Sequence, residues 1–216
     1  MTKETISLQE KRLERMRSCS ASYTITLLGK EIIVLPNVFY PATDTKLLIE
    51  TTRINPDESV LELCAGTGAI SLFLAEGARR ILATDINQHA IDNINANIKK
   101  HYLTGKMEAM IANVFPETNE KFDVLVINPP YTDKEAKDVV EMSVWDKDNI
   151  VIKKVLSGAR KYLIPIGRIY VSWANFADFY FFENLVRKEN YKIQRIAETT
   201  KENHTYRVYE LTPLLP

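Results

Sequence analysis

The hydrophobic residues of this 216-residue chain follow two alternating patterns from residue 59 onward. Short apolar runs, typical of buried strands, alternate with stretches in which apolar residues recur every three or four positions, as on one face of a helix. Ile91, Ile94 and Ile98 share such a face, and Asn87 stands where an N-cap is expected. The alternation predicts a parallel sheet covered by helices on both faces. The expected strands are 60–63, 81–85, 109–112, 124–127 and 169–173.

The N-terminal part of the chain has a different pattern. Residues 3–17 are highly charged and amphipathic, which predicts a surface helix. Residues 22–28 and 31–35 are apolar runs on either side of a Gly-Lys pair, which predicts a β-hairpin. We therefore expect residues 1–35 to form an extension of a helix and a hairpin, and residues 36–216 to form the main domain.

The C-terminal part predicts two more strands, at 191–197 and 206–211. The polar stretch 198–205 between them is too short for a crossover helix, so we expect it to be a connecting loop and the two strands to pair antiparallel. The expected fold is thus an α/β fold with a mostly parallel seven-stranded sheet that ends in an antiparallel hairpin.

The composition fits one folded domain, with 45% hydrophobic and 26% charged residues. Lys plus Arg and Asp plus Glu both number 28, so no overall positive field would attract nucleic acid. The charged start lacks the apolar core of a secretory signal, and no apolar run is long enough to span a bilayer. We expect a cytoplasmic protein with no membrane partner.

The metal-binding residue types are few and scattered. Cys19 and Cys64 have no paired spacing, and we expect both to be free thiols. The histidines, at His89, His101 and His204, are far apart in the sequence and are expected at the surface. The sequence therefore predicts no metal centre.

A glycine-containing loop follows the first expected strand of the main domain. Gly66 and Gly68 lie in this loop, and the second strand ends about 20 residues later at Asp85. Glycines let the backbone approach a ligand, and a carboxylate at the next strand end can accept both hydroxyl protons of a ribose. These features predict a nucleoside site. A nicotinamide dinucleotide fits it less well, because Ser71 replaces the third glycine of the dinucleotide motif.

The fourth expected strand ends in Asn128-Pro129-Pro130-Tyr131. Ligands of open α/β sheets bind at the carboxyl ends of the strands, so this tetrapeptide should face the nucleoside site. Prolines supply carbonyl acceptors and no N–H donors. Asn128 and the carbonyl of Pro129 can therefore hold the two hydrogens of an NH2 group, while Tyr131 stacks on the flat group that carries it.

This tetrapeptide resembles the motif of amino and amide N-methyltransferases that use S-adenosylmethionine. Together with the glycine loop and Asp85 it is similar to the HemK/PrmC branch, which has a "small methyltransferase" domain, and residues 38–48 resemble a segment found early in that domain. The similarity extends over roughly residues 36–211. It implies a Rossmann-like class I methyltransferase fold and an S-adenosylmethionine cofactor.

The resemblance also implies roles for individual residues. Asn113 stands where relatives commonly have an acidic residue, so its contact to adenine would lack a charge-assisted hydrogen bond. Asn128, Pro129 and Tyr131 would be the catalytic residues, and Asn128 would also border the cofactor. The implied cofactor-binding residues are Thr45, Glu62, Ala65, Gly66, Gly68, Asp85, Asn113 and Asn128.

The acceptor is open at this stage. A protein side-chain amide, such as that of glutamine, ranks first by the resemblance, and a small amine or amide metabolite ranks second. An exocyclic amine of an RNA or DNA base ranks third, because the net charge is zero. The helix and hairpin before residue 36 would grip the acceptor, recruit an activating subunit or second copy, or cover a small pocket. A binding module without enzymatic activity is a further alternative.

Aromatic residues suggest one more candidate. Phe179, Phe182 and Val186 fall at helical spacing and predict core positions. Trp145 instead follows the tetrapeptide in a polar segment, which makes it a candidate wall of the acceptor pocket. The charged run 133–138 between them has mixed sign and is expected to be a solvated loop.

Overall fold

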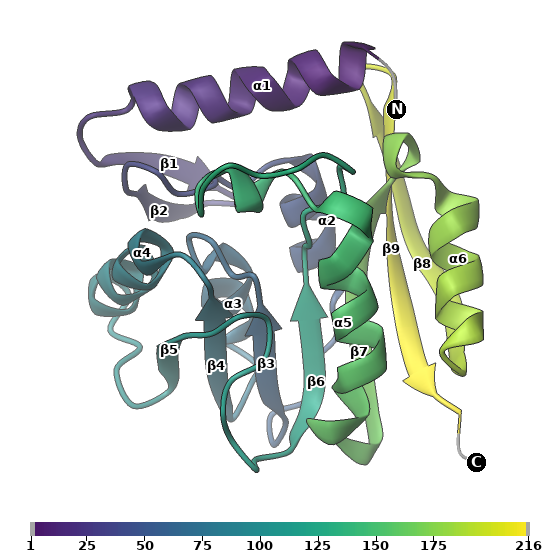
Figure 1. Ribbon diagram of the computed structural model, residues 1–216. Coiled ribbons are helices and arrows are strands. Elements are labelled where there is room, and N and C mark those ends of the chain that lie inside the picture. Colours follow the sequence, from purple (N-terminus) through teal and green to yellow (C-terminus); the bar gives the residue numbers. More distant parts are fainter. Residues whose placement is uncertain (1–2, 215–216) are drawn as a thin grey trace.

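The protein is described by a computed structural model that covers residues 3–214 (Figure 1). Its main sheet has seven strands. They are β3 (Ser59–Leu63), β4 (Arg80–Asp85), β5 (Met107–Ile111), β6 (Phe122–Ile127), β7 (Leu163–Ala174), β8 (Tyr191–Lys201) and β9 (His204–Pro213). The spatial order is β5-β4-β3-β6-β7-β9-β8, in which the first five strands are parallel and β9 is antiparallel to both of its neighbours. The predicted fold class is confirmed.

Helices cover both faces of this sheet (Figure 1). The side chains of each strand alternate between the faces, so Val60 packs on one face and Leu61 on the other. The helices over the Val60 face are α2 (Thr43–Thr51), α3 (Ala69–Leu74) and α4 (Gln88–Lys100), and those over the Leu61 face are α5 (Ile150–Gly158) and α6 (Phe179–Lys188). Four short 3-10 helices lie at Glu141–Ser143, Lys147–Asn149, Ala159–Lys161 and Asn175–Ala177.

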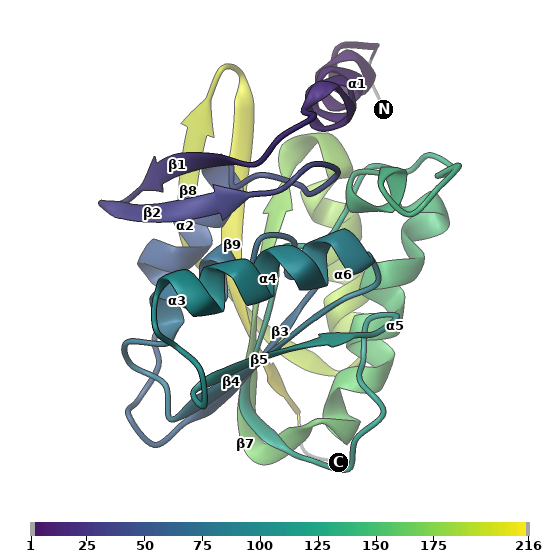
Figure 2. The ribbon, with the colours of Figure 1, turned by 90° about the vertical axis from the view of Figure 1, so that its left-hand side faces the viewer.

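The N-terminal elements pack on the main domain through hydrogen bonds as well as apolar contacts. They are α1 (Lys3–Ser18), β1 (Tyr23–Leu27) and β2 (Lys30–Val34), and the two strands form an antiparallel hairpin beside α4 (Figure 2). Two fully buried asparagines of α4 fix this hairpin: Asn97 Oδ1 accepts from Ile33 N at 2.9 Å and Asn93 Oδ1 accepts from Leu35 N at 2.7 Å. The expected helix and hairpin are confirmed.

Most local predictions agree with the structure. Asn87 caps α4, with its side chain accepting from His89 N at 3.0 Å. The expected loop at 198–205 is wrong, because β8 and β9 continue through it and leave only Glu202 and Asn203 as the turn, both with positive φ. Strand β8 is at the sheet edge, so backbone pairing with β9 maintains it where its side chains are polar and solvated.

The predicted boundary between an extension at 1–35 and a domain at 36–216 stays a prediction. Within residues 3–214, no helix has both the length and the apolar character needed to cross a membrane.

Candidate active site

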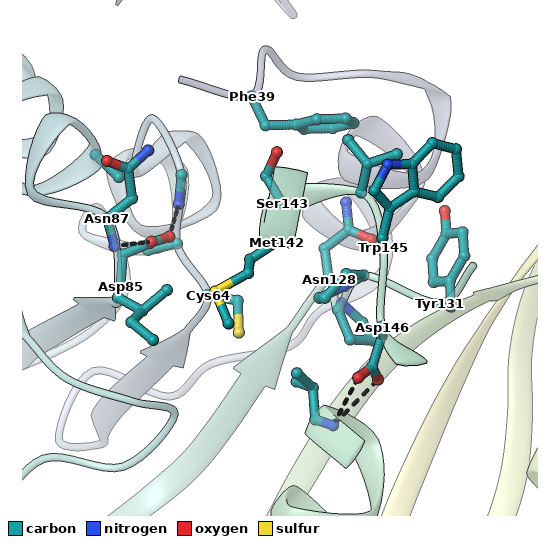
Figure 3. Close-up of a pocket in the computed structure, with 18 of the residues that line it drawn as sticks. Phe39, Cys64, Asp85, Asn87, Asn128, Tyr131, Met142, Ser143, Trp145 and Asp146 are labelled. Carbon is teal, nitrogen blue, oxygen red and sulfur yellow. Dashed lines mark hydrogen bonds between the residues drawn. The ribbon is translucent and has the colours of Figure 1, made fainter. Parts of the chain in front are cut away.

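A cavity of about 440 Å³ opens at the carboxyl ends of β3, β4 and β6. Figure 3 shows Asp85 on one side of it, Tyr131 on the other and Asn128 between them. This is the edge of the sheet at which open α/β folds bind ligands. Of the residues predicted from the sequence, those that line the cavity are Thr45, Glu62, Ala65, Gly66, Asp85, Asn113, Asn128, Pro129 and Tyr131.

Gly68 is the one predicted site residue outside this lining. It precedes α3 with φ +73°, and a Cβ added to it would lie 3.1 Å from Ile94 Cγ1. Both the left-handed backbone and the close contact with α4 require glycine here. Its position explains how the loop packs, and its contact with a cofactor stays a prediction.

Asp85 is held at the end of β4 by two backbone amides. Its Oδ2 accepts from Gly66 N and its Oδ1 from Asn87 N, both at 2.9 Å. Burial raises the pKa of the carboxyl above its ordinary value, and the bonds from Asn87 and Gly66 oppose that shift. Each carboxylate oxygen has a further lone pair. Asp85 can therefore accept two more hydrogen bonds from a molecule in the cavity.

Glu62 lies deeper in the cavity and is 1% exposed. It accepts hydrogen bonds from Ser71 N at 2.9 Å and from the Ser71 hydroxyl. Burial raises the pKa of Glu62 to about 8, although both bonds from Ser71 favour the charged form. The serine that replaces the third glycine of the dinucleotide motif is thus fully buried and orients Glu62. A cation bound beside Glu62 would favour its ionised form.

The cavity has two halves, a cofactor half around Asp85 and Glu62 and an acceptor half around Asn128 and Tyr131. In the cofactor half, the end away from Glu62 is apolar, apart from Asn113. Asn113 Oδ1 accepts from Lys154 Nζ at 3.1 Å, and the Asn113 carbonyl accepts from the same ammonium group at 2.8 Å. Sequence reasoning missed Lys154, which is 41 residues away on α5. The apolar side chains that line this end are Ile86, Val114 and Ile150, and such a lining suits the faces of a flat aromatic base.

Asn128 follows β6 with both ends of its side-chain amide bonded. Ser172 on β7 donates its hydroxyl to Asn128 Oδ1 at 2.5 Å, and Asn128 Nδ2 donates to Thr45 Oγ1 at 3.2 Å. This network assigns the amide orientation, and Oδ1 keeps one lone pair for a ligand. Ser172 was not predicted as a site residue, although a single serine inside an apolar strand indicates a buried hydrogen bond.

Tyr131 is 4% exposed and its hydroxyl donates to Asp44 Oδ2. Its ring lies 5.4 Å from that of Trp173 and 5.6 Å from that of Phe176. Burial and the adjacent Asp44 hold the pKa of Tyr131 well above its ordinary value. Asp44 itself is buried and escaped prediction from the sequence. Asp44 and Thr45, consecutive residues at the start of α2, therefore hold Tyr131 and Asn128 in place.

The wall beyond Tyr131 comes from α1 and from the segment after the tetrapeptide. Gln9 and Arg12 of α1 line the cavity, and sequence reasoning missed both. Trp145, the predicted wall candidate, also lines it and is 3% exposed. In the run 133–138, Lys134 contacts the Trp145 ring at 4.5 Å, so part of this predicted solvated loop packs on the wall.

Comparison with known proteins finds methyltransferases among the relatives of this chain. Over 159 residues the chain is 31% identical to the release factor glutamine methyltransferase of Streptococcus pneumoniae. This alignment covers 66% of this chain and 56% of that protein. Over 131 residues it is 32% identical to the ribosomal protein uL3 glutamine methyltransferase of Francisella tularensis, covering 54% of this chain and 41% of that protein. The chain thus spans about half the length of these relatives.

A solved structure shares the fold. The 16S rRNA N2 methyltransferase of T. thermophilus, in complex with AdoMet and guanosine, has a TM-score of 0.68 at 22% identity, covering 89% of this chain and 50% of that one. The sequence profile described as "Methyltransferase small domain" matches residues 31–210, which is most of the chain. The expected resemblance is confirmed, and the chain belongs to the methyltransferase small domain family.

Proposed function

We propose that this protein transfers a methyl group from S-adenosylmethionine to the side-chain amide nitrogen of a glutamine in another protein. The observation that carries the proposal is the position of Asn128. Its amide oxygen is fixed by Ser172 in the middle of the cavity, with Asp85 on one side and Tyr131 on the other (Figure 3). A group held at Asn128 can therefore meet a nucleoside cofactor held at Asp85.

The lining of the cofactor half fits S-adenosylmethionine. Asp85 has free lone pairs for the two ribose hydroxyls, and the apolar side chains at Ile86 and Ile150 suit the adenine ring. Glu62, which ionises near pH 8 when the cavity is free, suits the positively charged methionine part. The cavity volume of about 440 Å³ is within the range of small-molecule sites. Ala65, Gly66 and Asn113 complete the proposed cofactor site.

The proposed chemistry requires the chain to orient a poor nucleophile. An amide nitrogen delocalises its lone pair, and acceptors on both of its N–H groups increase its electron density as it attacks. Asn128 Oδ1 and the carbonyl of Pro129 supply these acceptors, and Tyr131 orients the amide plane. When bound, S-adenosylmethionine would supply a methyl group activated by its sulfonium. Transfer of that methyl would form the N–C bond as the C–S bond breaks, with S-adenosylhomocysteine as the leaving group, and the nitrogen would lose one proton to solvent.

Alignment can supply much of the rate enhancement, since well-oriented reacting groups reach effective molarities of about 10⁵ M or more. The hydrogen bonds from Ser172 and to Thr45 keep Asn128 in a single orientation before the acceptor arrives. This preorganisation removes the need for a dedicated general base in the proposed mechanism.

The protein acceptor is supported by the relatives, which are named as glutamine methyltransferases of a release factor and of a ribosomal protein. These acceptors belong to translation, and a cytoplasmic location is part of the proposal. A small amide metabolite is the second candidate, because α1 covers the acceptor end of the cavity. A base of RNA ranks third, because the net charge of zero provides no broad phosphate-binding surface.

The test is to incubate the protein with S-adenosylmethionine labelled in its methyl group and with separate pools of protein, metabolites and RNA. We expect label on glutamine amides in the protein pool, and none with the Asn128→Ala variant. Label confined to the metabolite or RNA pool would exclude the protein acceptor. An absence of label in every pool, despite measured cofactor binding, would favour a binding module.

A further inference from the structure

Helix α1 is fixed over the acceptor half of the cavity by polar and apolar contacts. Gln9 Nε2 donates to Thr132 Oγ1 at 3.1 Å, and both side chains are buried. Leu13 packs with Val144 and Trp145. At the outer edge, three ion pairs join the helix to the segment after Tyr131. Arg17 pairs with Asp138 at 2.6 Å and with Glu141 at 3.1 Å, and Glu10 pairs with Lys134 at 3.0 Å. The side chains that α1 turns inward are therefore held in a defined position.

Arg12 is the cation among these inward side chains. It lines the cavity above the Phe39 ring, 5.7 Å from its centroid, and its closest charged and phenolic neighbours include Tyr131 and Asp44. Its Nη1 donates to Gln9 Oε1 at 3.2 Å. A guanidinium has five N–H donors, so others remain for a bound molecule.

The charge of Arg12 has no ion-pair partner in the part of the chain that is described, where no carboxylate oxygen lies within 4.0 Å of it. Arg17, one turn further along the same helix, pairs with both Asp138 and Glu141. Asp44 is the carboxylate whose charge acts on Arg12, and its two oxygens accept from Thr45 N and from the Tyr131 hydroxyl. Asp44 balances the charge of Arg12 at a distance, and Gln9 and Tyr206 use only part of its donor capacity.

We propose that Arg12 binds a carboxylate of the methyl acceptor, so that the acceptor carries this anionic group close to the nitrogen that is methylated. The proposal deepens the proposed function and rests on it. Guanidinium groups bind carboxylates through two parallel hydrogen bonds, which fixes the orientation of the bound molecule as well as its charge. Arg12 and Tyr131 line the same cavity, so the carboxylate end would lie at α1 while the amide end lies at Asn128.

A carboxylate fits this position better than a nucleic-acid phosphate. Binding along a phosphate backbone uses several cations at once, whereas Lys147, the other cation in the lining, lies close to Asp133 and Asp148. Within the cavity lining, Arg12 is thus the one cation without a carboxylate within 4.0 Å among the residues that the structure describes. The carboxylate has two chemical sources, the free carboxyl group of a small amide metabolite and the chain terminus of a polypeptide.

The experiment compares matched probes that differ only in the carboxylate. N-acetylglutamine is paired with neutral N-acetylglutaminamide, and a short peptide ending in glutamine is paired with its C-terminally amidated form. Binding is measured by calorimetry in the presence of S-adenosylhomocysteine, and methylation is measured separately with labelled cofactor. The variants are Arg12→Gln, the charge-retaining Arg12→Lys, and the control Arg15→Gln, which alters an exposed arginine of α1 outside the cavity lining.

We expect at least one carboxylate probe to bind the unaltered protein tenfold or more tightly than its neutral partner. Arg12→Gln should remove that preference without weakening the neutral probe, Arg12→Lys should restore part of it, and Arg15→Gln should retain it. If only N-acetylglutamine shows the preference, the carboxylate belongs to a small amide metabolite. If the peptide shows it, the carboxylate belongs to the chain terminus of a polypeptide. Equal binding of charged and neutral probes, or an unchanged preference in a folded Arg12→Gln variant, overturns the proposal.

The two proposals fail in different ways. A carboxylate preference that depends on Arg12, without methylation of any probe, supports the Arg12 site and counts against the proposed transfer to an amide. Methylation of charged and neutral probes at equal rates supports the transfer and overturns the Arg12 site. If RNA alone is labelled, and Arg12→Gln reduces that labelling, the proposal that Arg12 binds a carboxylate is also wrong.

Discussion

The two halves of the cavity are built in different ways. In the cofactor half, Asp85 and Glu62 accept from backbone amides that are 19 and 9 residues away, at Gly66 and Ser71. In the acceptor half, the tetrapeptide depends on side chains from distant segments. Asn128 bonds to Thr45, 83 residues earlier, and Tyr131 to Asp44, 87 residues earlier.

This difference has consequences for both stability and function. Backbone donors are present whatever the side chain, so the amide bonds to Asp85 and Glu62 survive most neighbouring substitutions, except at positions such as Gly68 whose backbone and packing require glycine. The acceptor half consists of a side-chain network, in which the loss of one member leaves a buried partner unsatisfied. We therefore expect substitutions in the acceptor half to reduce turnover strongly while cofactor affinity changes little.

The largest expected effect is at Asn128. Asn128→Ala removes a proposed acceptor of the reacting NH2 group and should lower single-turnover rates about 10²–10³-fold, as observed for positioned hydrogen-bonding groups in other active sites. Rapid-quench measurements with labelled cofactor check this. The exposed Asn55→Ala variant is the control and should retain the full rate. A rate within about threefold of the unaltered protein would remove Asn128 from the chemistry.

The next effect is on stability in the cofactor half. The folded pKa of Glu62, about 8, is above its ordinary value of 4.5 because of burial. Folding therefore favours the protonated form, and this contribution is complete below pH 4.5 and is lost as pH rises through 8. Relative to Glu62→Gln, the unliganded protein should lose about 4–5 kcal/mol of stability across that window, because the pKa lies about 3.5 units above its ordinary value and each unit corresponds to about 1.4 kcal/mol.

Urea unfolding of both proteins at pH 5, 7 and 9 measures this difference. The Gln variant keeps the shape and removes the titration, so the gap between the two curves should widen in its favour with pH. Parallel curves across the window would show that Glu62 is ionised in the folded state.

A smaller effect is expected where Asp44 positions Tyr131. Asp44→Asn and Tyr131→Phe each remove the same charged hydrogen bond and should each lower kcat about tenfold. Because both changes break one contact, the double variant should be little worse than either single one. Steady-state kinetics of the three variants check this. Additive losses would mean that the two residues act independently.

The smallest effect is expected at Lys154. Its ammonium occupies Asn113 Oδ1, so Lys154→Met frees that oxygen for its proposed contact with the adenine amine and should tighten cofactor binding about twofold to threefold. Equilibrium dialysis with labelled cofactor measures the change, and the exposed Lys153→Met variant of the same helix is the control. A tenfold loss of affinity would instead show that Lys154 contacts the cofactor itself.

The same division explains what the sequence could predict. The strand patterns, the N-cap at Asn87 and the glycine loop before Asp85 are local signals, and the structure confirms the elements that they predicted. The tetrapeptide was recognised because its four residues are contiguous. Its supports were missed, since Asp44 and Ser172 become neighbours of the tetrapeptide only when α2 and β7 pack around the end of β6.

Two further features, the position of Arg12 and the full length of β8 and β9, were not predicted from the sequence, each for its own physical reason. Arg12 looked like one more charge on a surface helix, because an amphipathic pattern does not reveal which residues at its polar edge turn toward a cavity. The polar ends of β8 and β9 lack apolar alternation, since their pairing depends on backbone bonds at a solvated edge.

The central claim is that the cofactor half of the cavity binds S-adenosylmethionine independently of the acceptor half. One calorimetric series with S-adenosylmethionine tests it most directly. The unaltered protein should bind one molecule per chain, and Asn128→Ala should bind it with an affinity within about threefold. Asp85→Ala should weaken binding by about 1.5–3 kcal/mol, as expected when hydrogen bonds to a charged group are lost. An absence of binding by the unaltered protein, or equal losses in both variants, would contradict the account.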